Sequence, residues 1–262
     1  MTIFFYIIVF MYGLVIGSFL NVCIWRIPLG ESVVKPPSHC TKCGTRLTAL
    51  DLVPLFSYLF LRGKCRYCKV KISIKYPLME LLTAIIYLPL FYKYGHNGQY
   101  IEFFAAAYLM SILIVVFFID LKHRKIPNSL VASGLVGSIV LIVYNFFKPL
   151  YIYGDSNWWN PILGMVVSSG FIFIVSLISM GLFKKESFGF GDIKLLFVIG
   201  AYFGWKMSLV ALCATLAISA LAVLVAAVLK RNDKRGNIPF GSFIAVGTYI
   251  TFLFGSEITK YF

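Results

Sequence analysis

Four cysteines stand in one connecting stretch as two Cys-x-x-Cys pairs. The first pair is Cys40 and Cys43, the second is Cys65 and Cys68, and 21 residues separate the pairs. Each pair lets two thiolates chelate one ion from a tight turn, and the second pair completes a tetrahedral four-cysteine site typical of zinc. The pattern predicts a structural zinc site, with a redox-active pair or free thiols as the alternatives.

Metal binding would supply much of the folding energy of this stretch. Apart from one apolar patch between Leu50 and Leu61, the stretch has little from which to build a core. His39 adjoins the first pair, and its plainer interpretation is a solvated loop histidine.

Two acidic residues stand at the edges of long apolar runs. Asp120 ends the run LMSILIVVFFID, and Asp192 opens the run IKLLFVIGAYFG. An ionisable residue at the edge of a membrane span is costly and therefore indicates function. Two carboxyl groups close together cannot both ionise, so one stays protonated while the other activates water. The pair thus predicts aspartic-protease chemistry, which needs no metal.

Glycines flank the second of these acids in the sequence Phe188-Gly189-Phe190-Gly191-Asp192. Gly189 and Gly191 would let the backbone approach a partner helix or an extended substrate. The helix that starts here would favour the ionised form of Asp192 through its dipole. Taken singly, each acid also has a plainer structural explanation. Asp192 would be a helix N-cap, and Asp120 would pair with Lys122 or Arg124.

Other polar residues within apolar segments favour structural roles. Glu80, near the start of a span, is expected to be structural and salt-bridged. Asn21 and Ser18 are expected to make hydrogen bonds between helices. Gly13 and Gly17 form a G-x-x-x-G pattern, which is weak evidence of close helix packing.

The composition requires a membrane to surround these residues. The 262 residues are 60% hydrophobic and 13% charged, with a mean hydropathy of +0.88. Soluble domains are about 45–50% apolar and about 25% charged, so a soluble enzyme, a secreted scaffold and a disordered chain are excluded. We predict an all-α, polytopic transmembrane helical bundle with about eight spans. The candidate spans are 3–25, 77–94, 101–119, 129–147, 160–183, 195–204, 206–229 and 240–259.

The spans divide the chain into three parts. Residues 1–25 form the first transmembrane helix, which we expect to be retained because no Lys or Arg precedes Arg26. Residues 26–76 form a small zinc-binding loop domain, and residues 77–262 form the helical catalytic domain.

The basic residues predict the orientation of the bundle. The chain has 24 Lys and Arg against 10 Asp and Glu, for a net charge of +14. Twenty of the 24 fall in the connecting segments 26–76, 120–128, 184–194 and 230–239. The positive-inside rule makes these segments cytoplasmic and the N-terminus external. The charges then face anionic lipid headgroups, so no nucleic acid partner is implied. Both acids fall at cytoplasmic ends of helices.

Taken together, these motifs resemble the prepilin peptidases, also called type IV prepilin leader peptidases, which are GxGD-type intramembrane aspartic proteases. The resemblance covers nearly the whole chain, and six motifs occur in the family's order. They are Gly17–Pro28, the cysteine loop from Ser38 to Cys68, Ile74–Thr83, Ile119–Asn128, Gly189–Leu196 and Ile238–Ser242. The one departure is Asn128, where an acid is common in the family.

The resemblance implies a bacterial inner-membrane enzyme with Asp120 and Asp192 as its catalytic pair. Its substrates would be prepilins and pseudopilins, cut at the cytoplasmic boundary of the membrane after a short basic leader. Family members that keep the four cysteines often also N-methylate the new pilin N-terminus with S-adenosylmethionine. The rival hypotheses are a peptidase without methyltransferase activity, a proton-coupled transporter and a non-enzymatic assembly factor. The sequence leaves the substrate and the oligomeric state open.

Overall fold

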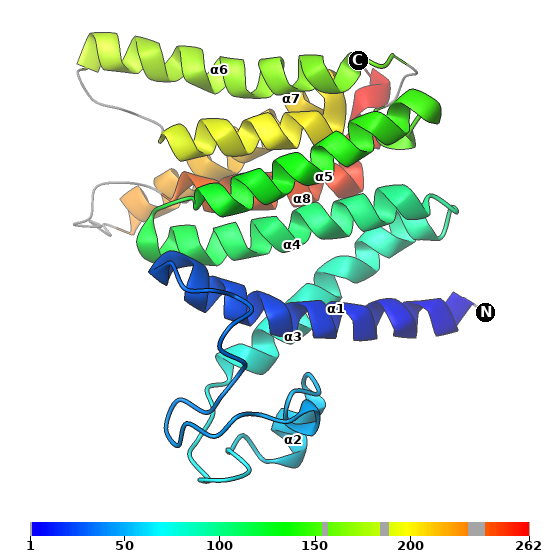
Figure 1. Cartoon of the computed structure of the whole chain (residues 1–262). Helices are drawn as coiled ribbons and strands as arrows, with labels where there is room; N and C mark the ends of the chain where they lie inside the picture. The colour runs from blue at the N-terminus through cyan, green and yellow to red at the C-terminus, as the bar shows by residue number, and fades with distance from the viewer. Residues whose placement is uncertain (1, 154–156, 184–188, 230–238, 262) are drawn as a thin grey trace. The chain divides into compact units, whose positions relative to one another are not determined.

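The computed structural model describes residues 2–153, 157–183, 189–229 and 239–261, and its regular elements are helices (Figure 1). Within these ranges, β-type pairing is limited to two isolated bridges, His39 with Arg46 and Lys64 with Lys71. The all-α prediction is therefore confirmed. The basic residues of 184–188 and 230–238, together with Phe188 and Ile238 of the motifs, lie outside the described residues.

The chain forms two compact units, Met1–Asn97 and Gly98–Phe262, and each is described by itself. The helices of unit 1 are α1 (Thr2–Arg26), η1 (Ile27–Leu29), η2 (Ala49–Asp51), α2 (Phe56–Phe60), α3 (Lys75–Leu90) and the π-helix η3 (Phe91–Gly95). The helices of unit 2 are α4 (Tyr100–His123), α5 (Asn128–Phe147), η4 (Tyr151–Tyr153), α6 (Asn160–Phe183), α7 (Phe190–Val228), α8 (Phe240–Ile258) and η5 (Thr259–Tyr261).

Among the described residues, six helical segments are long and apolar enough to cross a membrane, so this is a multi-pass membrane protein. They are Ile3–Leu29, Tyr100–His123, Asn128–Phe147, Asn160–Leu182, Phe190–Val228 and Phe240–Tyr261. The eight predicted spans differ from these six in two places. The predicted span 77–94 is α3, an α-helix of only 16 residues that continues as η3. The predicted spans 195–204 and 206–229 are the two halves of α7.

Gly204 separates those two halves of α7. Its φ of 69° and ψ of −179° are not helical, and the sequence predicted the boundary at this residue. Figure 1 shows the start (yellow) and the end (orange) of α7 on the same side of the unit. The side-chain oxygen of Asn160 accepts a hydrogen bond of 2.9 Å from the Trp205 N–H. This bond satisfies a backbone group at the break, as a broken helix in a membrane requires.

In unit 1, α1 packs directly against α3 (Figure 1). A Cβ atom on Gly13 would lie 2.5 Å from the Cα of Ala84, and one on Gly17 would lie 2.6 Å from the Cα of Glu80. The G-x-x-x-G pattern therefore marks a close helix contact, as predicted. Asn21 donates a 3.1 Å hydrogen bond to the Tyr76 carbonyl, which is the predicted type of bond between helices.

In unit 2, α8 packs against both α4 and α7, while α6 and α5 cover α7. The rings of Phe203 and Phe252 lie 4.6 Å apart in the core between α7 and α8. This packing brings the beginning of α8 to the end of α4, where Asp120 stands.

Candidate active site and metal centre

Asp120 occupies the last full turn of α4 and is 5% exposed. The helix ends shortly after it because Arg124 adopts a left-handed conformation, with φ 54°. The Arg124 N–H donates a 2.8 Å hydrogen bond to the Asp120 carbonyl and so closes the last turn. The apolar run that the sequence places before Asp120 thus carries this carboxyl group to a buried helix end.

The carboxyl group of Asp120 meets the beginning of α8. Its Oδ2 atom accepts a 3.0 Å hydrogen bond from the Ser242 N–H, and the Ser242 hydroxyl lies 3.5 Å away. Ser242 is the third residue of α8, and its N–H also donates to the Pro239 carbonyl at 3.2 Å. This N–H belongs to the first turn of the helix, where a negative charge is favoured. Arg124 adds a favourable electrostatic interaction with the carboxylate.

Gly241 makes this approach possible. A Cβ atom at this position would lie 3.0 Å from Asp120 Oδ2 and 3.0 Å from Ile126 Cδ1. Both contacts are tighter than ordinary van der Waals separation, so a larger residue would force the carboxyl group or Ile126 to move.

Asp192 is buried in the first turn of α7, with 9% of its surface exposed. Its Oδ2 atom accepts a 3.0 Å hydrogen bond from the Gly189 N–H, and its own N–H donates to the Gly189 carbonyl at 3.0 Å. The N-cap position is Gly189, so the simple expectation that Asp192 is itself the N-cap is wrong. Asp192 is the third helical residue and reaches back to the cap.

Ile126 connects the surroundings of the two acids. A Cβ atom on Gly191 would lie 3.1 Å from Ile126 Cβ, and the same side chain faces Gly241. The segment after α4 therefore crosses between the glycine that adjoins Asp192 and the glycine that faces Asp120. Ile126 therefore lies next to the surroundings of both acids that the sequence predicts as a pair.

The four predicted metal ligands also come together, in unit 1. The Sγ atoms of Cys40, Cys43, Cys65 and Cys68 all lie within 4.8 Å of one another. The Sγ atoms of Cys40 and Cys68 are 3.8 Å apart. Zinc–sulfur bonds of about 2.3 Å in a tetrahedron give sulfur–sulfur distances of about 3.8 Å. The cluster could therefore hold a metal ion such as zinc.

The two cysteine pairs have the same backbone form. Cys40 N–H donates to Thr45 O at 2.9 Å, and Cys65 N–H donates to Val70 O at 2.8 Å. The residue after each pair is left-handed, namely Gly44 with φ 70° and Lys69 with φ 59°. Two equivalent turns facing each other form the paired knuckles that a four-cysteine metal site needs.

Backbone N–H groups favour the thiolate form in these turns. Hydrogen bonds from the Cys43 backbone lower the pKa of Cys40, and those from the Cys68 backbone lower the pKa of Cys65. A thiolate is the form that binds a metal ion.

Arg66, in the second knuckle, forms an ion pair with Asp51. Its Nε lies 2.6 Å from Asp51 Oδ1, and this bond holds the pKa of Asp51 well below its usual range. Tyr67 also donates to Asp51, at 3.2 Å. Asp51 therefore ties the segment between the knuckles to the second knuckle.

Two further sequence candidates have structural positions in unit 1. Glu80 is buried, and its carboxylate accepts a 2.7 Å hydrogen bond from the Leu55 N–H. The partner of Glu80 is thus a backbone N–H, whereas the sequence analysis expected a salt bridge. His39 is exposed beside the metal cluster, with its Nδ1 atom 3.1 Å from the Pro37 carbonyl, as expected for a loop histidine.

The residues that the sequence did not assign are Ser242, Gly241 and Ile126. The sequence flagged the Pro-Phe-Gly-Ser run as a motif but gave no reason to place it against Asp120, which lies 122 positions earlier. Only the packing of α8 on α4 makes that contact.

Two protein families match this chain, one in each unit. The bacterial peptidase A24 N-terminal domain matches residues 11–94, and the type IV leader peptidase family matches residues 107–228. The second match contains Asp120 and Asp192 but stops before α8. No solved structure shows a significant match.

Several curated proteins resemble the chain over nearly its whole length. A prepilin leader peptidase/N-methyltransferase of Bacillus subtilis is 33% identical over 97% of this chain and 96% of that protein. Proteins of the same name from Aeromonas hydrophila and Pseudomonas putida are each 32% identical. These two matches cover 97% and 94% of this chain, and 92% and 89% of the respective relatives. With both family matches and relatives of this coverage, the chain belongs to the type IV leader peptidase family.

Proposed function

We propose that this protein is a membrane aspartic endopeptidase that removes the basic leader peptide from type IV prepilins and pseudopilins. We also propose that it N-methylates the new pilin N-terminus. The observation that carries the peptidase is that Asp120 and Asp192 are both buried at helix ends of unit 2, beside glycines that face the same Ile126 side chain. The name of the relatives, prepilin leader peptidase/N-methyltransferase, supports both activities.

The chemistry follows from two carboxyl groups that share one proton. The ionised carboxylate takes a proton from water while the water oxygen attacks the scissile carbonyl carbon. The protonated carboxyl group then gives its proton to the leaving amine. No metal takes part in this scheme, and the cysteine cluster lies in unit 1 while both acids lie in unit 2.

Backbone N–H groups orient the carboxyl group of each acid for these proton transfers. The Ser242 N–H donates to Oδ2 of Asp120, and the Gly189 N–H donates to Oδ2 of Asp192. One oxygen of each carboxyl group is therefore fixed by a backbone N–H. Gly189 and Gly191 support the site through the cap and the close approach of Ile126.

We place the active site at the cytoplasmic face of the bacterial inner membrane, with the N-terminus outside. Asp120 stands in the last turn of α4, Asp192 in the first turn of α7, and Ser242 in the first turn of α8. The basic segments 120–128, 184–194 and 230–239 adjoin these three helix ends, which supports a common cytoplasmic side. In that orientation, residues 26–76 are a cytoplasmic loop domain, and 77–262 contain the catalytic site.

The four-cysteine cluster is proposed to bind zinc as a structural ion, because its sulfur spacing fits a tetrahedral thiolate site. The methyl donor implied by the relatives' name is S-adenosylmethionine. The methyl group would pass from its sulfonium to the pilin amine, which loses a proton. We assign no residue of the chain to this donor.

A transporter that couples transport to protons is a weaker candidate. Its carboxyl groups would be expected near the membrane midplane and often in paired repeats. Here both acids stand in terminal turns of their helices. An assembly factor without catalysis would use the zinc loop alone and would give no reason for the buried acid pair.

One assay separates these functions. The purified protein is incubated in detergent with a synthetic prepilin, and the products are identified by mass spectrometry. We expect one cut after the basic leader. With S-adenosylmethionine present, we expect the product to gain one methyl group at its N-terminus. An intact prepilin after prolonged incubation with folded protein would contradict the peptidase assignment.

Replacing Gly241 with alanine is expected to slow prepilin cleavage by about tenfold. The new Cβ would lie 3.0 Å from Asp120 Oδ2, so the carboxyl group would have to move by a small fraction of its length. Since a misplacement of about 1 Å can cost about a hundredfold in rate, this smaller shift should cost less. Single-turnover cleavage rates measure the effect.

Gly170→Ala is the matched control, because a Cβ at that α6 position would meet nothing within 4 Å. The control should cleave at the wild-type rate, and both variants should unfold near the wild-type temperature. Wild-type cleavage by the Gly241→Ala variant would mean that α8 does not position Asp120.

A further inference from the structure

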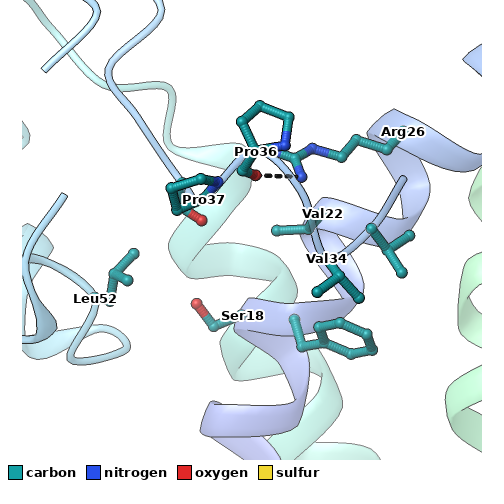
Figure 2. Close-up of a pocket in the computed structure, with 10 residues that line it drawn as sticks. Ser18, Val22, Arg26, Val34, Pro36, Pro37 and Leu52 are labelled. Atoms are coloured by element: carbon teal, nitrogen blue, oxygen red, sulfur yellow. Dashed lines mark hydrogen bonds between the residues drawn. The ribbon is translucent and has the colours of Figure 1, made fainter. Parts of the chain in front are cut away.

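A pocket opens in unit 1 between the second half of α1 and the loop that follows it (Figure 2). Its volume is about 270 Å³. Phe19, Val22 and Arg26 line it from α1, while Val34, Pro36 and Leu52 line it from the loop. The pocket contains none of the proposed catalytic or metal-binding residues.

Arg26 brings a buried positive charge to this pocket. The residue is 9% exposed, in the last turn of α1. Its Nη1 atom donates to the Ser32 carbonyl at 3.0 Å and to the Pro36 carbonyl at 2.8 Å, and Figure 2 shows the second bond. Both acceptors are neutral. Within the described residues, no ion pair joins Arg26 to a carboxylate, and its hydrogen bonds there go to these two backbone carbonyl groups.

A buried guanidinium without a counter-charge favours an added anion. Burying a charge is costly unless an opposite charge and hydrogen bonds compensate for it. A guanidinium also has a planar fork of N–H donors that fits phosphate oxygens, and only Nη1 is occupied by protein acceptors here. The pocket therefore has the chemistry of an anion site.

The walls of the pocket indicate that this anion carries apolar chains. Phe19 is 50% exposed, Val34 is 75% exposed and Leu52 is 40% exposed. Phe19 belongs to a helix that is long and apolar enough to cross a membrane, and Arg26 stands near the end of that helix. Large exposed apolar side chains next to a membrane helix face lipid, and phosphate is the anionic group at the lipid surface.

We propose that this pocket binds the phosphate headgroup of an anionic phospholipid. Arg26 is the phosphate ligand, and Phe19 and Val34 pack against the first part of an acyl chain. Because Arg26 also holds the carbonyl groups of Ser32 and Pro36, the bound lipid would anchor the start of the cysteine loop to the membrane surface.

The first test compares Arg26→Gln with Lys35→Gln. Lys35 is exposed on the same loop and lies outside the pocket lining, so it controls for loss of one surface charge. Binding of phosphatidylglycerol to each purified protein in detergent is measured by native mass spectrometry. We expect one tightly bound lipid per wild-type chain, and about tenfold weaker binding for Arg26→Gln, the loss typical of one hydrogen bond to a charged group. Lys35→Gln should bind as the wild type does.

A second pair of variants keeps Arg26 and its hydrogen bonds. Val34→Glu places a carboxylate at the pocket, whereas Leu50→Glu places one on a similarly exposed loop residue outside it. We expect Val34→Glu to weaken lipid binding about tenfold and Leu50→Glu to leave it unchanged. Val34→Glu and Leu50→Glu therefore test whether the lipid binds in the pocket even if Arg26→Gln does not fold.

Three results would overturn the proposal. Equal binding by wild type and both pocket variants would exclude the pocket as the site. Equal weakening by the pocket variants and their controls would show attraction to surface charge alone. Displacement of the lipid by inorganic phosphate at an equal concentration would show a site for a free anion and not for a lipid.

Discussion

Asp120→Asn and Asp192→Asn should each reduce prepilin cleavage by about 10²–10⁴-fold, while the protein still accumulates in the membrane. An amide can neither take a proton from water nor give one to the leaving amine, and general acid–base catalysis contributes about 10²–10⁴-fold in rate. Asparagine keeps an oxygen that can accept the N–H bonds of Ser242 and Gly189, so the fold should persist. Cleavage of a co-expressed prepilin, followed by gel shift and product mass, measures the loss.

Glu257→Gln is the control for this experiment. Glu257 is an exposed acid of unit 2 and pairs with Lys260 at 2.6 Å, away from the proposed site. It should cleave at the wild-type rate. Full activity in either aspartate variant would exclude the two-carboxylate mechanism. Because the acids act as one unit, the double variant should be little worse than either single variant.

Serine substitutions of the four loop cysteines should release the bound zinc and unfold the segment between them. Each substitution removes one thiolate from a tetrahedral set whose sulfur atoms lie within 4.8 Å. Structural zinc in small peptides contributes about 10–16 kcal/mol of apparent binding free energy, which here would be folding free energy of the loop. Metal analysis of the purified protein should fall from about one zinc per chain toward zero. Limited proteolysis should then cut between residues 44 and 64.

Cys213→Ser is the matched control, because Cys213 is an exposed cysteine of α7. It should retain the zinc of the wild type. Since the aspartates belong to the other unit, we expect the cysteine variants to lose N-methylation to a greater extent than cleavage. Unchanged zinc content in all four variants would refute the metal site.

Much of this site could be predicted from the sequence because the relevant sequence patterns are local. A Cys-x-x-Cys turn sets the distance between its two sulfur atoms by itself, so the spacing of Cys40 and Cys43 already predicted a knuckle. Apolar runs of membrane length predicted the helices, and an acid at the end of such a run is conspicuous because charge is costly there. The predicted spans 195–204 and 206–229 also meet next to Gly204, where α7 breaks.

Other features depend on residues far apart in the chain. One structural explanation for Asp192 was that it is the N-cap of its helix. The N-cap is Gly189. The residue that begins a helix depends on backbone geometry, which sequence patterns predict poorly. Arg66 lies between the two cysteines of the second pair, and its guanidinium binds Asp51, which stands 15 positions earlier in the chain.

The sequence by itself determined the class of protein, the four cysteines that could bind a metal and the two acids that we propose as the catalytic pair. These follow from residue type, hydropathy and short spacing, which need no knowledge of partners. The tertiary structure alone decided which backbone groups hold those acids, through the packing of α8 on α4 that places Ser242 and Gly241 at Asp120. It also decided that Arg26 is buried beside a pocket and donates to two backbone carbonyl groups. Burial and hydrogen bonding of a charge are properties of the space around it, and distant parts of the chain fill that space.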